Sequence, residues 1–136
     1  MKIHIYFIGK PRDTHANAIA EDYMRRISHY AKAEMSEIRT RTDPWAKYPS
    51  AMVIGLDPAG KTAPSLTAMV ERAEAGARDL VFIVGGADGL TPEHKKRADS
   101  LLSLSPMTYP HELARAMLAE QIYRAFTTLR GHPYPR

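Results

Sequence analysis

The residues best suited to binding a ligand lie in one stretch, Asp79–Leu90, with the sequence DLVFIVGGADGL. Its apolar run, Leu80–Val84, is followed at once by Gly85 and Gly86 and then by Gly89. A short apolar run bounded by turn residues is typical of a strand buried on both faces, and glycines let the backbone turn sharply without adding side chains. Open α/β sheets bind ligands beyond the carboxyl ends of their strands, so we expect a ligand here. The alternative is a strand followed by an ordinary turn, because glycine pairs are common in turns.

A second glycine-containing stretch, Gly55–Thr62 (GLDPAGKT), fits the G-x-x-x-x-G-K-[ST] pattern of phosphate-binding loops. In that interpretation Lys61 would contact phosphates and Thr62 would hold magnesium. Pro58 argues against it, because proline lacks one of the backbone N–H groups with which such a loop binds phosphate. The apolar run Leu80–Val84 also ends in glycine rather than in the aspartate that completes the magnesium site. An NTP-binding protein is therefore kept only as an alternative.

Three other motifs are absent from the sequence. His111-Glu112 is not followed by a second histidine four residues after His111, so the zinc-binding pattern H-E-x-x-H fails. G-x-S-x-G does not occur, and Gly85–Gly89 does not meet G-x-G-x-x-G. The chain has no cysteine, which excludes a disulfide framework and cysteine–metal clusters. We therefore expect no metal site.

The composition predicts one globular domain spanning residues 1–136. Hydrophobic residues make up 44% and charged residues 25% of the chain, an ordinary globular mixture. The net charge of +4 suits a solvated surface as well as nucleic-acid binding. The first residues, up to Gly9 and including His4, are too few and too polar for a signal peptide, and no run of about 18 apolar residues occurs. We expect a cytoplasmic protein with no membrane partner.

The elements that must position these residues alternate along the chain in the manner of an α/β protein. Strands are expected at Lys2–Ile8, Glu34–Thr42, Ala51–Leu56, Leu80–Val84 and Asp99–Ser105. Helices are expected at Thr14–Lys32, at Pro64–Ala75, from Thr91 onward and at His111–Arg130, and a loop at Asp43–Ser50. The charge of Glu34–Thr42 places that strand near an edge of the sheet. Trp45, in the loop, could stack on a base or close the edge of the core.

Two helices carry informative patterns. In the first, Ile19, Tyr23, Ile27 and Tyr30 recur at helical spacing and predict its buried stripe. The last helix is apolar on two faces, one holding Ala114, Leu118, Ile122, Ala125, Phe126 and Leu129, the other Leu113, Met117, Glu120 and Arg124. Such a helix needs two neighbours, and one could be a second copy of the chain. Arg115, at the margin of the main stripe, is expected to pair with a carboxylate.

The last third of the chain resembles a known family. VFIVGGADGL, LSLSPMTYPHELAR, AEQIYRAF and the HPY-x-R tail are similar to segments of the bacterial 23S rRNA pseudouridine N3-methyltransferases, the RlmH family of the SPOUT class. MKIHIYFIGK, EDYMRRI and GLDPAGK match as well. The likeness therefore covers nearly the whole chain, except around Asp43–Ser50, which looks shorter than usual.

The resemblance implies a mostly parallel sheet flanked by helices, with a C-terminal trefoil knot that runs against the general rule for protein folds. It also implies a homodimer with two S-adenosylmethionine sites. By position, the cofactor would be held by Leu56, Gly85, Leu104, Ser105, Pro106, Met107, Thr108 and Tyr109. The substrate would be a pseudouridine in 23S rRNA of assembled ribosomes, with no DNA partner.

Methylation of N3 needs alignment of donor and acceptor, a route for the N3 proton, and stabilisation of negative charge on the ring carbonyls. A guanidinium suits the last task. The resemblance directs attention to the tail, which in the family usually ends in Tyr-His-Arg, whereas Pro135 here stands where histidine is expected. We expect Arg136 to supply the charge stabilisation and Tyr134 to position the substrate.

The identity of the general base is left open, because Pro135 stands where the family has histidine. His132 could replace the family histidine, solvent could accept the proton, or the enzyme could be weak. Arg124 is the next catalytic candidate after the tail. A non-catalytic RNA-binding dimer is the alternative from another functional class.

Overall fold

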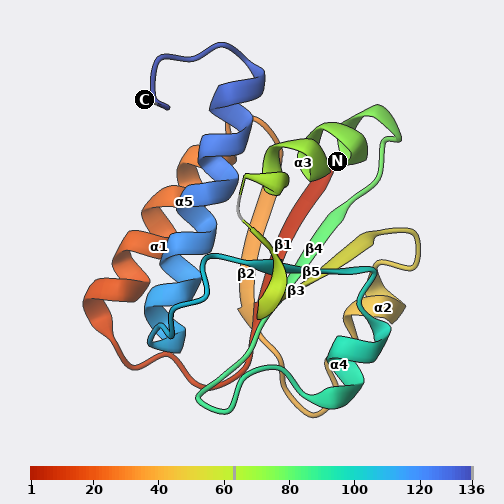
Figure 1. The fold of residues 1–136 in the computed structure, drawn as a ribbon, viewed down its shortest axis with the longest axis vertical. Coiled ribbons are helices and arrows are strands. Elements are labelled where there is room, and N and C mark those ends of the chain that lie inside the picture. Colours follow the sequence, from red (N-terminus) through yellow and green to blue (C-terminus); the bar gives the residue numbers. More distant parts are fainter. Residues whose placement is uncertain (63, 136) are drawn as a thin grey trace.

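The computed structural model describes residues 1–62 and 64–135 and contains a five-stranded sheet in which every neighbouring pair of strands is parallel. The strands are β1 (Lys2–Phe7), β2 (Lys32–Glu37), β3 (Met52–Thr62), β4 (Leu80–Val84) and β5 (Ser100–Ser103), in the spatial order β2-β1-β4-β3-β5. The helices are α1 (Thr14–Ile27), α2 (Pro44–Lys47), α3 (Ser65–Ala75), α4 (Pro92–Arg97) and α5 (His111–Leu129). Helices α1 and α5 flank one side of the sheet, and α2 and α4 lie toward the other (Figure 1). The expected α/β fold with a parallel sheet is confirmed.

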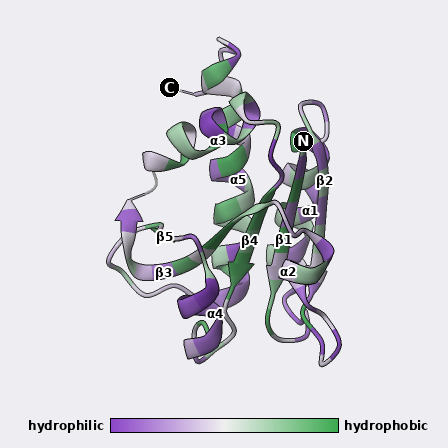
Figure 2. Cartoon of the chain, turned by 90° about the vertical axis from the view of Figure 1, so that its right-hand side faces the viewer, coloured by the Kyte–Doolittle hydropathy of each residue, from purple (hydrophilic) through white to green (hydrophobic). Residues whose placement is uncertain are grey.

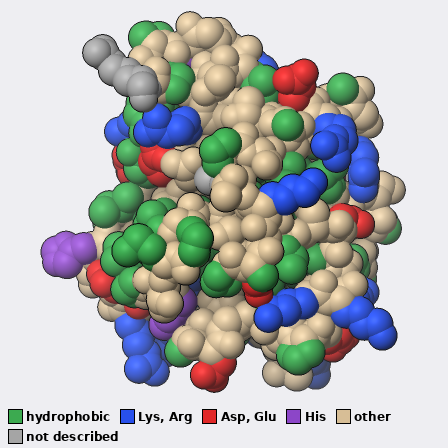
Figure 3. All heavy atoms as spheres, in the orientation of Figure 1, with side chains coloured by type: hydrophobic (Ala, Val, Ile, Leu, Met, Phe, Trp, Pro, Cys, Tyr) green, Lys and Arg blue, Asp and Glu red, His purple; other side chains and the backbone are tan. Residues whose placement is uncertain are grey.

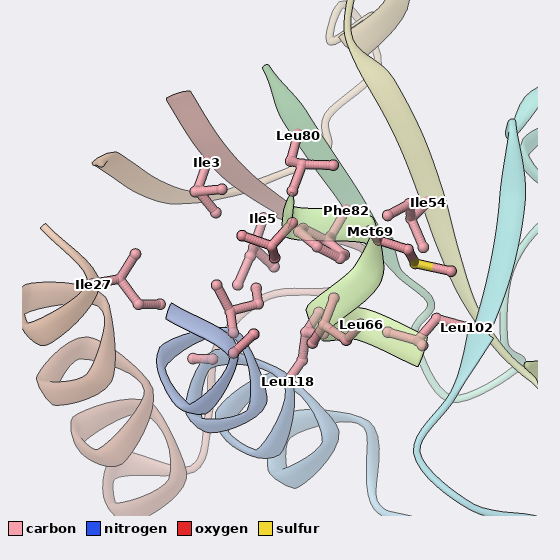
Figure 4. Close-up of a cluster of buried hydrophobic side chains, with 14 of the residues drawn as sticks. Ile3, Ile5, Ile27, Ile54, Leu66, Met69, Leu80, Phe82, Leu102 and Leu118 are labelled. Atoms are coloured by element: carbon pink, nitrogen blue, oxygen red, sulfur yellow. The ribbon is translucent and has the colours of Figure 1, made fainter. Parts of the chain in front are cut away.

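The strand β4, predicted to be buried on both faces, is the central strand of the sheet. Leu80, Phe82 and Val84 belong to the core under α1, α3 and α5, and Val81 and Ile83 belong to a smaller core on the other face. The larger core joins strand residues such as Ile5 and Phe82 to helix residues such as Leu66 and Leu118 (Figure 4). In the view turned by 90°, apolar residues concentrate on the central strands (Figure 2). Burial on both faces explains why β4 has no polar alternation in its sequence.

The first helix is shorter than predicted. It ends at Ile27 instead of continuing to Lys32, because the backbone N–H of Ser28 bonds to the carbonyls of Met24 and Arg25 and the chain then turns. The backbone N–H of Tyr30 bonds to the Ile27 carbonyl at 2.8 Å within that turn. Lys32 is thereby free to begin β2, where it pairs with β1.

The buried stripe of α1 also differs from the prediction. The residues that face the core are Ala16, Ala20, Met24 and Ile27, whereas Ile19 is 48% exposed. Ile27 is buried as predicted, and Tyr23 and Tyr30 are partly buried against the core. Ala16 and Ala20 carry the smallest side chains of the buried face, so α1 can pack closely against α5. Ile19 is therefore left on the surface.

Between β2 and β3 the structure corrects two boundaries. The strand expected at Glu34–Thr42 runs from Lys32 to Glu37 and lies at the edge of the sheet, as its charge suggested. The loop expected at Asp43–Ser50 contains the short helix α2, because the Asp43 side chain accepts hydrogen bonds from the backbone N–H groups of Trp45 (3.0 Å) and Ala46 (3.3 Å). Trp45 packs against the smaller core, with the Arg97 guanidinium 4.1 Å from its ring.

The third strand is longer than predicted and contains the phosphate-loop pattern. Leu56 and Lys61 both pair with Leu102 of β5, and residues 57–60 bulge out between them. The segment Gly55–Thr62 is thus a bulged strand rather than a loop between a strand and a helix. It does not form the phosphate-binding loop on which the alternative of an NTP-binding protein rests.

The longest helix, α5, follows the prediction closely. Its main face is buried, and Leu113 and Met117 of its other face are 42% and 37% exposed. Glu120 and Arg124 form the expected ion pair at 2.7 Å. Within the described ranges, no helix combines the length and the apolar character needed to cross a membrane.

Candidate functional site

A cavity of about 250 Å³ lies at the carboxyl ends of β4 and β5, beside the bulge of β3. Its lining comprises Leu56, Asp57, Pro58, Val84, Gly85, Gly86, Ala87, Gly89, Ser103, Leu104, Ser105, Met107, Thr108, Tyr109, His111 and Ala114. These residues come from the β3 bulge, the loop after β4, the loop after β5 and the first turns of α5. Because the strands are parallel, their carboxyl ends meet at one edge, which is where α/β sheets bind ligands.

The cavity brings together all the residues predicted to hold a cofactor except Pro106, which lies between the lining residues Ser105 and Met107. Sequence reasoning missed other members of the lining, among them Gly86, Gly89 and His111. The two glycines belong to the same G-G-A-D-G run, and His111 begins the helix that follows the lining loop. Their closeness in the sequence to the predicted residues was the signal that could have placed them in the cavity lining.

The floor of the cavity is made of backbone, because the loop after β4 folds onto itself. The N–H of Gly89 donates to the carbonyl of Gly86 at 3.0 Å, and Gly89 has a φ of +77°, which glycine adopts without strain. A Cβ atom at Gly85 would lie 2.5 Å from both the Gly89 carbonyl oxygen and the Leu90 nitrogen. The loop can therefore close only because residue 85 has no side chain.

The loop after β5 is held by its own side chains. Ser105 Oγ accepts a hydrogen bond from the N–H of Met107 at 3.0 Å and lies 2.6 Å from the Tyr109 hydroxyl. Ser103 Oγ donates to the Ser105 carbonyl at 2.9 Å. These bonds order the loop, so its remaining backbone groups face the cavity in a defined arrangement.

The cavity wall carries little net charge. The backbone N–H of Ala59 is the main cause that lowers the pKa of the Asp57 carboxyl, and Lys95, whose Nζ lies 3.0 Å from Asp57 Oδ2, adds to it. Asp57 is thus ionised and already neutralised by Lys95. The remaining walls are largely apolar side chains and backbone, such as Leu56, Val84 and Gly85. They suit an uncharged, flat ligand group better than a phosphate chain.

Among the predicted catalytic residues, Tyr134 and Arg124 meet on α5. The Tyr134 hydroxyl donates to Glu120 Oε2 at 2.7 Å and lies 3.2 Å from the Tyr23 hydroxyl, and Arg124 Nη2 donates to the same Glu120 oxygen at 2.7 Å. Burial, followed by the hydrogen bonds with Tyr23 and Glu120, raises the pKa of the Tyr134 phenol far above its usual value of 10.0. Sequence reasoning missed Tyr23 in this cluster and saw Glu120 only as the helical partner of Arg124.

Of the two other catalytic candidates in the tail, the structure describes only His132. His132 is exposed, and its Nδ1 accepts a hydrogen bond from the backbone N–H of Tyr134 at 3.1 Å. Arg136 lies outside the described residues. Tyr134, His132 and Arg124 are absent from the lining of the cavity in the protomer to which they belong.

Arg115 has the carboxylate partner that its position predicted. It is fully buried, with Nη1 3.7 Å from Glu112 Oε1, and Nη2 donates to the carbonyls of Ile8 (3.1 Å) and Gly9 (3.2 Å). The backbone N–H of Arg12, at 2.6 Å from Glu112 Oε1, is the main cause that lowers the Glu112 pKa to about 2. The pair therefore ties the β1–α1 loop to the start of α5, next to the cavity.

An apolar surface remains on the α1–α5 pair. Ile19, Leu113 and Met117 are exposed, and they lie between the contact of Asn17 with Glu112 (3.1 Å) and the contact of Tyr23 with Tyr134. Apolar side chains gather over the lower part of this helix pair in the space-filling view (Figure 3). Neighbouring exposed apolar side chains of this kind are typical of interaction surfaces.

The chain is similar to methyltransferases in both sequence and fold. A family model described as "Predicted SPOUT methyltransferase" matches residues 1–135. The ribosomal RNA large subunit methyltransferase H of Solibacter usitatus (strain Ellin6076) is 61% identical over 139 residues, with 100% of both chains covered. The protein of the same name from Koribacter versatilis (strain Ellin345) is 35% identical, with 98% of this chain and 97% of the relative covered.

Solved structures agree on the fold. A putative methylase family protein from Neisseria gonorrhoeae has a TM-score of 0.60 at 10% identity, with 89% of this chain and 81% of that chain covered. The SpoU methyltransferase AviRb from Streptomyces viridochromogenes, solved in complex with the cofactor AdoMet, has a TM-score of 0.58 at 10% identity, with coverage of 92% and 58%.

Proposed function

This chain belongs to the SPOUT methyltransferase family, and we propose that it transfers a methyl group from S-adenosylmethionine to N3 of a pseudouridine in 23S ribosomal RNA. The activity on large-subunit ribosomal RNA is the one for which its relatives are named. The choice of N3 of pseudouridine rests on the resemblance of the glycine stretch, the loop after β5 and the tail. The observation that carries the proposal is the cavity at the carboxyl ends of β4 and β5 and the bulge of β3, which gathers all the residues predicted for the cofactor except Pro106.

The residues of the cavity fit S-adenosylmethionine. The apolar walls and the side-chain-free floor at Gly85 and Gly86 suit an adenosine, and the ordered loop Leu104–Tyr109 offers backbone groups for its polar edges. The AdoMet complex of AviRb belongs to a protein of the same fold. When bound, S-adenosylmethionine supplies an activated methyl group on a cationic sulfonium.

The chain's own contribution to the reaction is orientation and charge stabilisation. We propose that Arg136 stabilises the negative charge that spreads to the carbonyls of the acceptor base, because a guanidinium can donate two parallel hydrogen bonds. Tyr134 holds the nucleotide in place through its ring and its fixed hydroxyl. Arg124 is already bound by Glu120, so it supports the tail rather than acting as the first donor.

The N3 proton leaves by a route that does not include the Tyr134 phenolate. The Tyr134 hydroxyl donates a hydrogen bond to Glu120, and its raised pKa keeps it protonated at neutral pH. The remaining acceptors are His132, whose exposed ring lies beside Tyr134, and solvent. Pro135 cannot accept the N3 proton as a histidine could, but His132 and solvent remain as bases for the reaction.

We also propose that the enzyme works as a homodimer through the α1–α5 surface. A helix of the length of α5 spans about 28 Å, and the cavity lies at its first turns, whereas the tail follows its last turn. A twofold axis across Ile19, Leu113 and Met117 pairs this apolar surface with itself, as isologous interfaces require. Antiparallel α5 helices would then bring the tail of one protomer toward the cavity of its partner.

The place of action follows from the substrate. We infer that the protein acts in the cytoplasm on assembled ribosomes, as a single domain. The C-terminal trefoil knot implied by the resemblance stays a prediction.

The test is transfer of a tritium-labelled methyl group from S-adenosylmethionine to ribosomes whose target is unmethylated. We expect label in large-subunit RNA, with an equal amount of heat-inactivated protein as the control. An RNA-binding dimer without activity would bind ribosomes and leave them unlabelled. Calorimetry separates the other alternative, because we expect S-adenosylmethionine to bind and ATP with magnesium not to bind.

A further inference from the structure

The C-terminal tail is held at two places on the surface of its own protomer. Tyr134 contacts Glu120 and Tyr23 through its hydroxyl, and its ring packs edge-on against Tyr123 with the centroids 4.7 Å apart. Pro135 lines a second cavity, of about 470 Å³, bounded by α3 and α5. The tail is therefore seated on the helices instead of extending into solvent.

Glu120 is the centre of the first contact. Its Oε1 accepts hydrogen bonds from Gln121 Nε2 (2.9 Å) and Arg124 Nε (3.3 Å), and its Oε2 accepts from Arg124 Nη2 and the Tyr134 hydroxyl, both at 2.7 Å. Burial acts to raise its pKa, but the hydrogen bonds from Arg124 and Tyr134 outweigh that effect and the pKa is lowered. An ionised carboxylate with both oxygens bonded has one orientation, and it imposes that orientation on Tyr134.

The backbone of the tail complements this contact. Gly131 has a φ of +67°, which lets the chain reverse at the end of α5 and return along the helix toward Glu120. Pro133 and Pro135 flank Tyr134 and restrict the backbone on both sides. Few conformations are then lost when the Tyr134 hydroxyl meets Glu120.

We propose that Glu120, assisted by Tyr23, is a positioning residue for the tail: by holding the Tyr134 hydroxyl it fixes the position of residues 132–134 against α1 and α5. The catalytic consequence rests on the proposed function, in which the tail acts on the nucleotide. Glu120 itself is not among the residues that line the cavity proposed for the cofactor. Pro135, which replaces the histidine expected from the family, lines the cavity between α3 and α5.

The experiment compares Glu120→Met, Tyr134→Phe and the double variant with the wild type. Methionine has no strong acceptor for the Tyr134 hydroxyl, whereas Tyr134→Phe keeps the aromatic packing and the pair of Glu120 with Arg124 and removes the bonds of the hydroxyl to Glu120 and Tyr23. Glu21→Met, at an exposed carboxylate on α1, and Tyr30→Phe, at a phenol stacked on Phe126, are the matched controls. The readouts are the heteronuclear 15N NOE of residues 132 and 134, kcat and KM on ribosomes, S-adenosylmethionine affinity and the thermal midpoint.

We expect the 15N NOE of the tail to fall to values of a mobile segment in all three variants and to stay unchanged in the controls. The value of kcat should fall about tenfold in each single variant, the effect of one lost hydrogen bond to a charged group. The double variant should lose no more than the single variants, because both break the same bond. Cofactor affinity should change less than about twofold, since the bond lies outside the cavity.

An ordered tail in Tyr134→Phe would overturn the proposal, and so would losses that multiply to about a hundredfold in the double variant. A fall in kcat accompanied by a clear fall in both cofactor affinity and thermal midpoint would show general destabilisation and would also overturn the proposal. If the wild type transfers no methyl group, the proposed function fails, but the NOE comparison still decides whether Glu120 and Tyr23 hold the tail.

Discussion

Replacing Gly85 by alanine tests how the floor of the cavity is built. A Cβ atom there would lie 2.5 Å from the Gly89 oxygen and the Leu90 nitrogen, and still nearer to the Gly89 carbonyl carbon. Ordinary contacts of a Cβ atom begin at 3.4 Å, so the peptide between Gly89 and Leu90 must move by about 1 Å. Both neighbours are backbone atoms and cannot rotate away as a side chain could.

The displacement reaches the residues proposed for the cofactor, because the loop that lines the cavity is anchored in the core at Leu90. Leu90 is 6% exposed and packs in the smaller core with Val53, Val81 and Ile83. Moving it costs about 1–3 kcal/mol of the free energy of unfolding, the range for overpacked interiors. A shift of about 1 Å in the lining should lower the affinity for S-adenosylmethionine about a hundredfold, as misplacements of that size do in active sites.

The assay is isothermal titration with S-adenosylmethionine, together with the thermal midpoint of each variant. Gly76→Ala is the matched control, because a Cβ atom there has its nearest neighbour at an ordinary 3.6 Å and should leave the affinity unchanged. Gly89→Ala adds a second comparison, since it meets no atom within 4 Å but has a φ of +77°, so only backbone strain is introduced. We expect Gly85→Ala to lose about a hundredfold in affinity for S-adenosylmethionine. An affinity within about threefold of that of the wild type would refute this explanation of the cavity floor.

Three further predictions concern the dimer, the tail and the sheet. Leu113→Glu combined with Met117→Glu should give monomers in light scattering at micromolar concentration and abolish methyl transfer, whereas dimers of full activity would contradict the proposed interface. Arg136→Ala should lower transfer roughly 10²-fold with unchanged cofactor affinity, and full turnover on ribosomes would move the search to Arg124. Burial is the main cause that lowers the His4 pKa from 6.5 to about 4, so the unfolded chain binds the proton first as the pH falls. The free energy of unfolding should then decrease from about pH 6.5 to pH 4 by up to about 3 kcal/mol, and His4→Gln should lack this decrease in urea titrations unless the reasoning is wrong.

The parts of the fold that the sequence predicts well are those in which burial alone decides the pattern. Leu80–Val84 is apolar without interruption because both faces are covered, and the carboxyl end of such a strand locates the cavity. The cap at Thr91, whose side chain accepts from the N–H of His94 at 3.1 Å, likewise depends only on local contacts. Each of these features could be predicted from neighbouring residues.

The predictions failed where distant contacts decide. The strand expected at Ala51–Leu56 extends to Thr62, because residues 57–60, which include Pro58, bulge out of the ladder and β3 then pairs with β5 again. Ile19 fitted the helical stripe as well as Ala20 does, and only the close packing of α1 on α5 selects the alanine.

In the candidate site, too, the sequence predicts what neighbouring residues decide and misses what distant contacts decide. The resemblance named Gly85 and the loop after β5, and the structure supplies the reason, which is the closure of the loop at Gly89. It named Tyr134 as well, but Tyr23 lies 111 positions earlier in the chain, and no local pattern relates the two hydroxyls. Contacts of that kind become visible only when the helices are packed.

We propose that the cavity and the tail together serve the methylation of N3 of a pseudouridine in 23S ribosomal RNA. The most direct measurement is mass spectrometry of nuclease-digested ribosomal RNA after reaction with S-adenosylmethionine, with ribosomes lacking the pseudouridine as a parallel substrate. We expect one new methyl group, on N3 of a pseudouridine in 23S RNA, and none in the parallel substrate. A methyl group on a ribose or on another base, or no methyl group from an enzyme that binds S-adenosylmethionine, would contradict it.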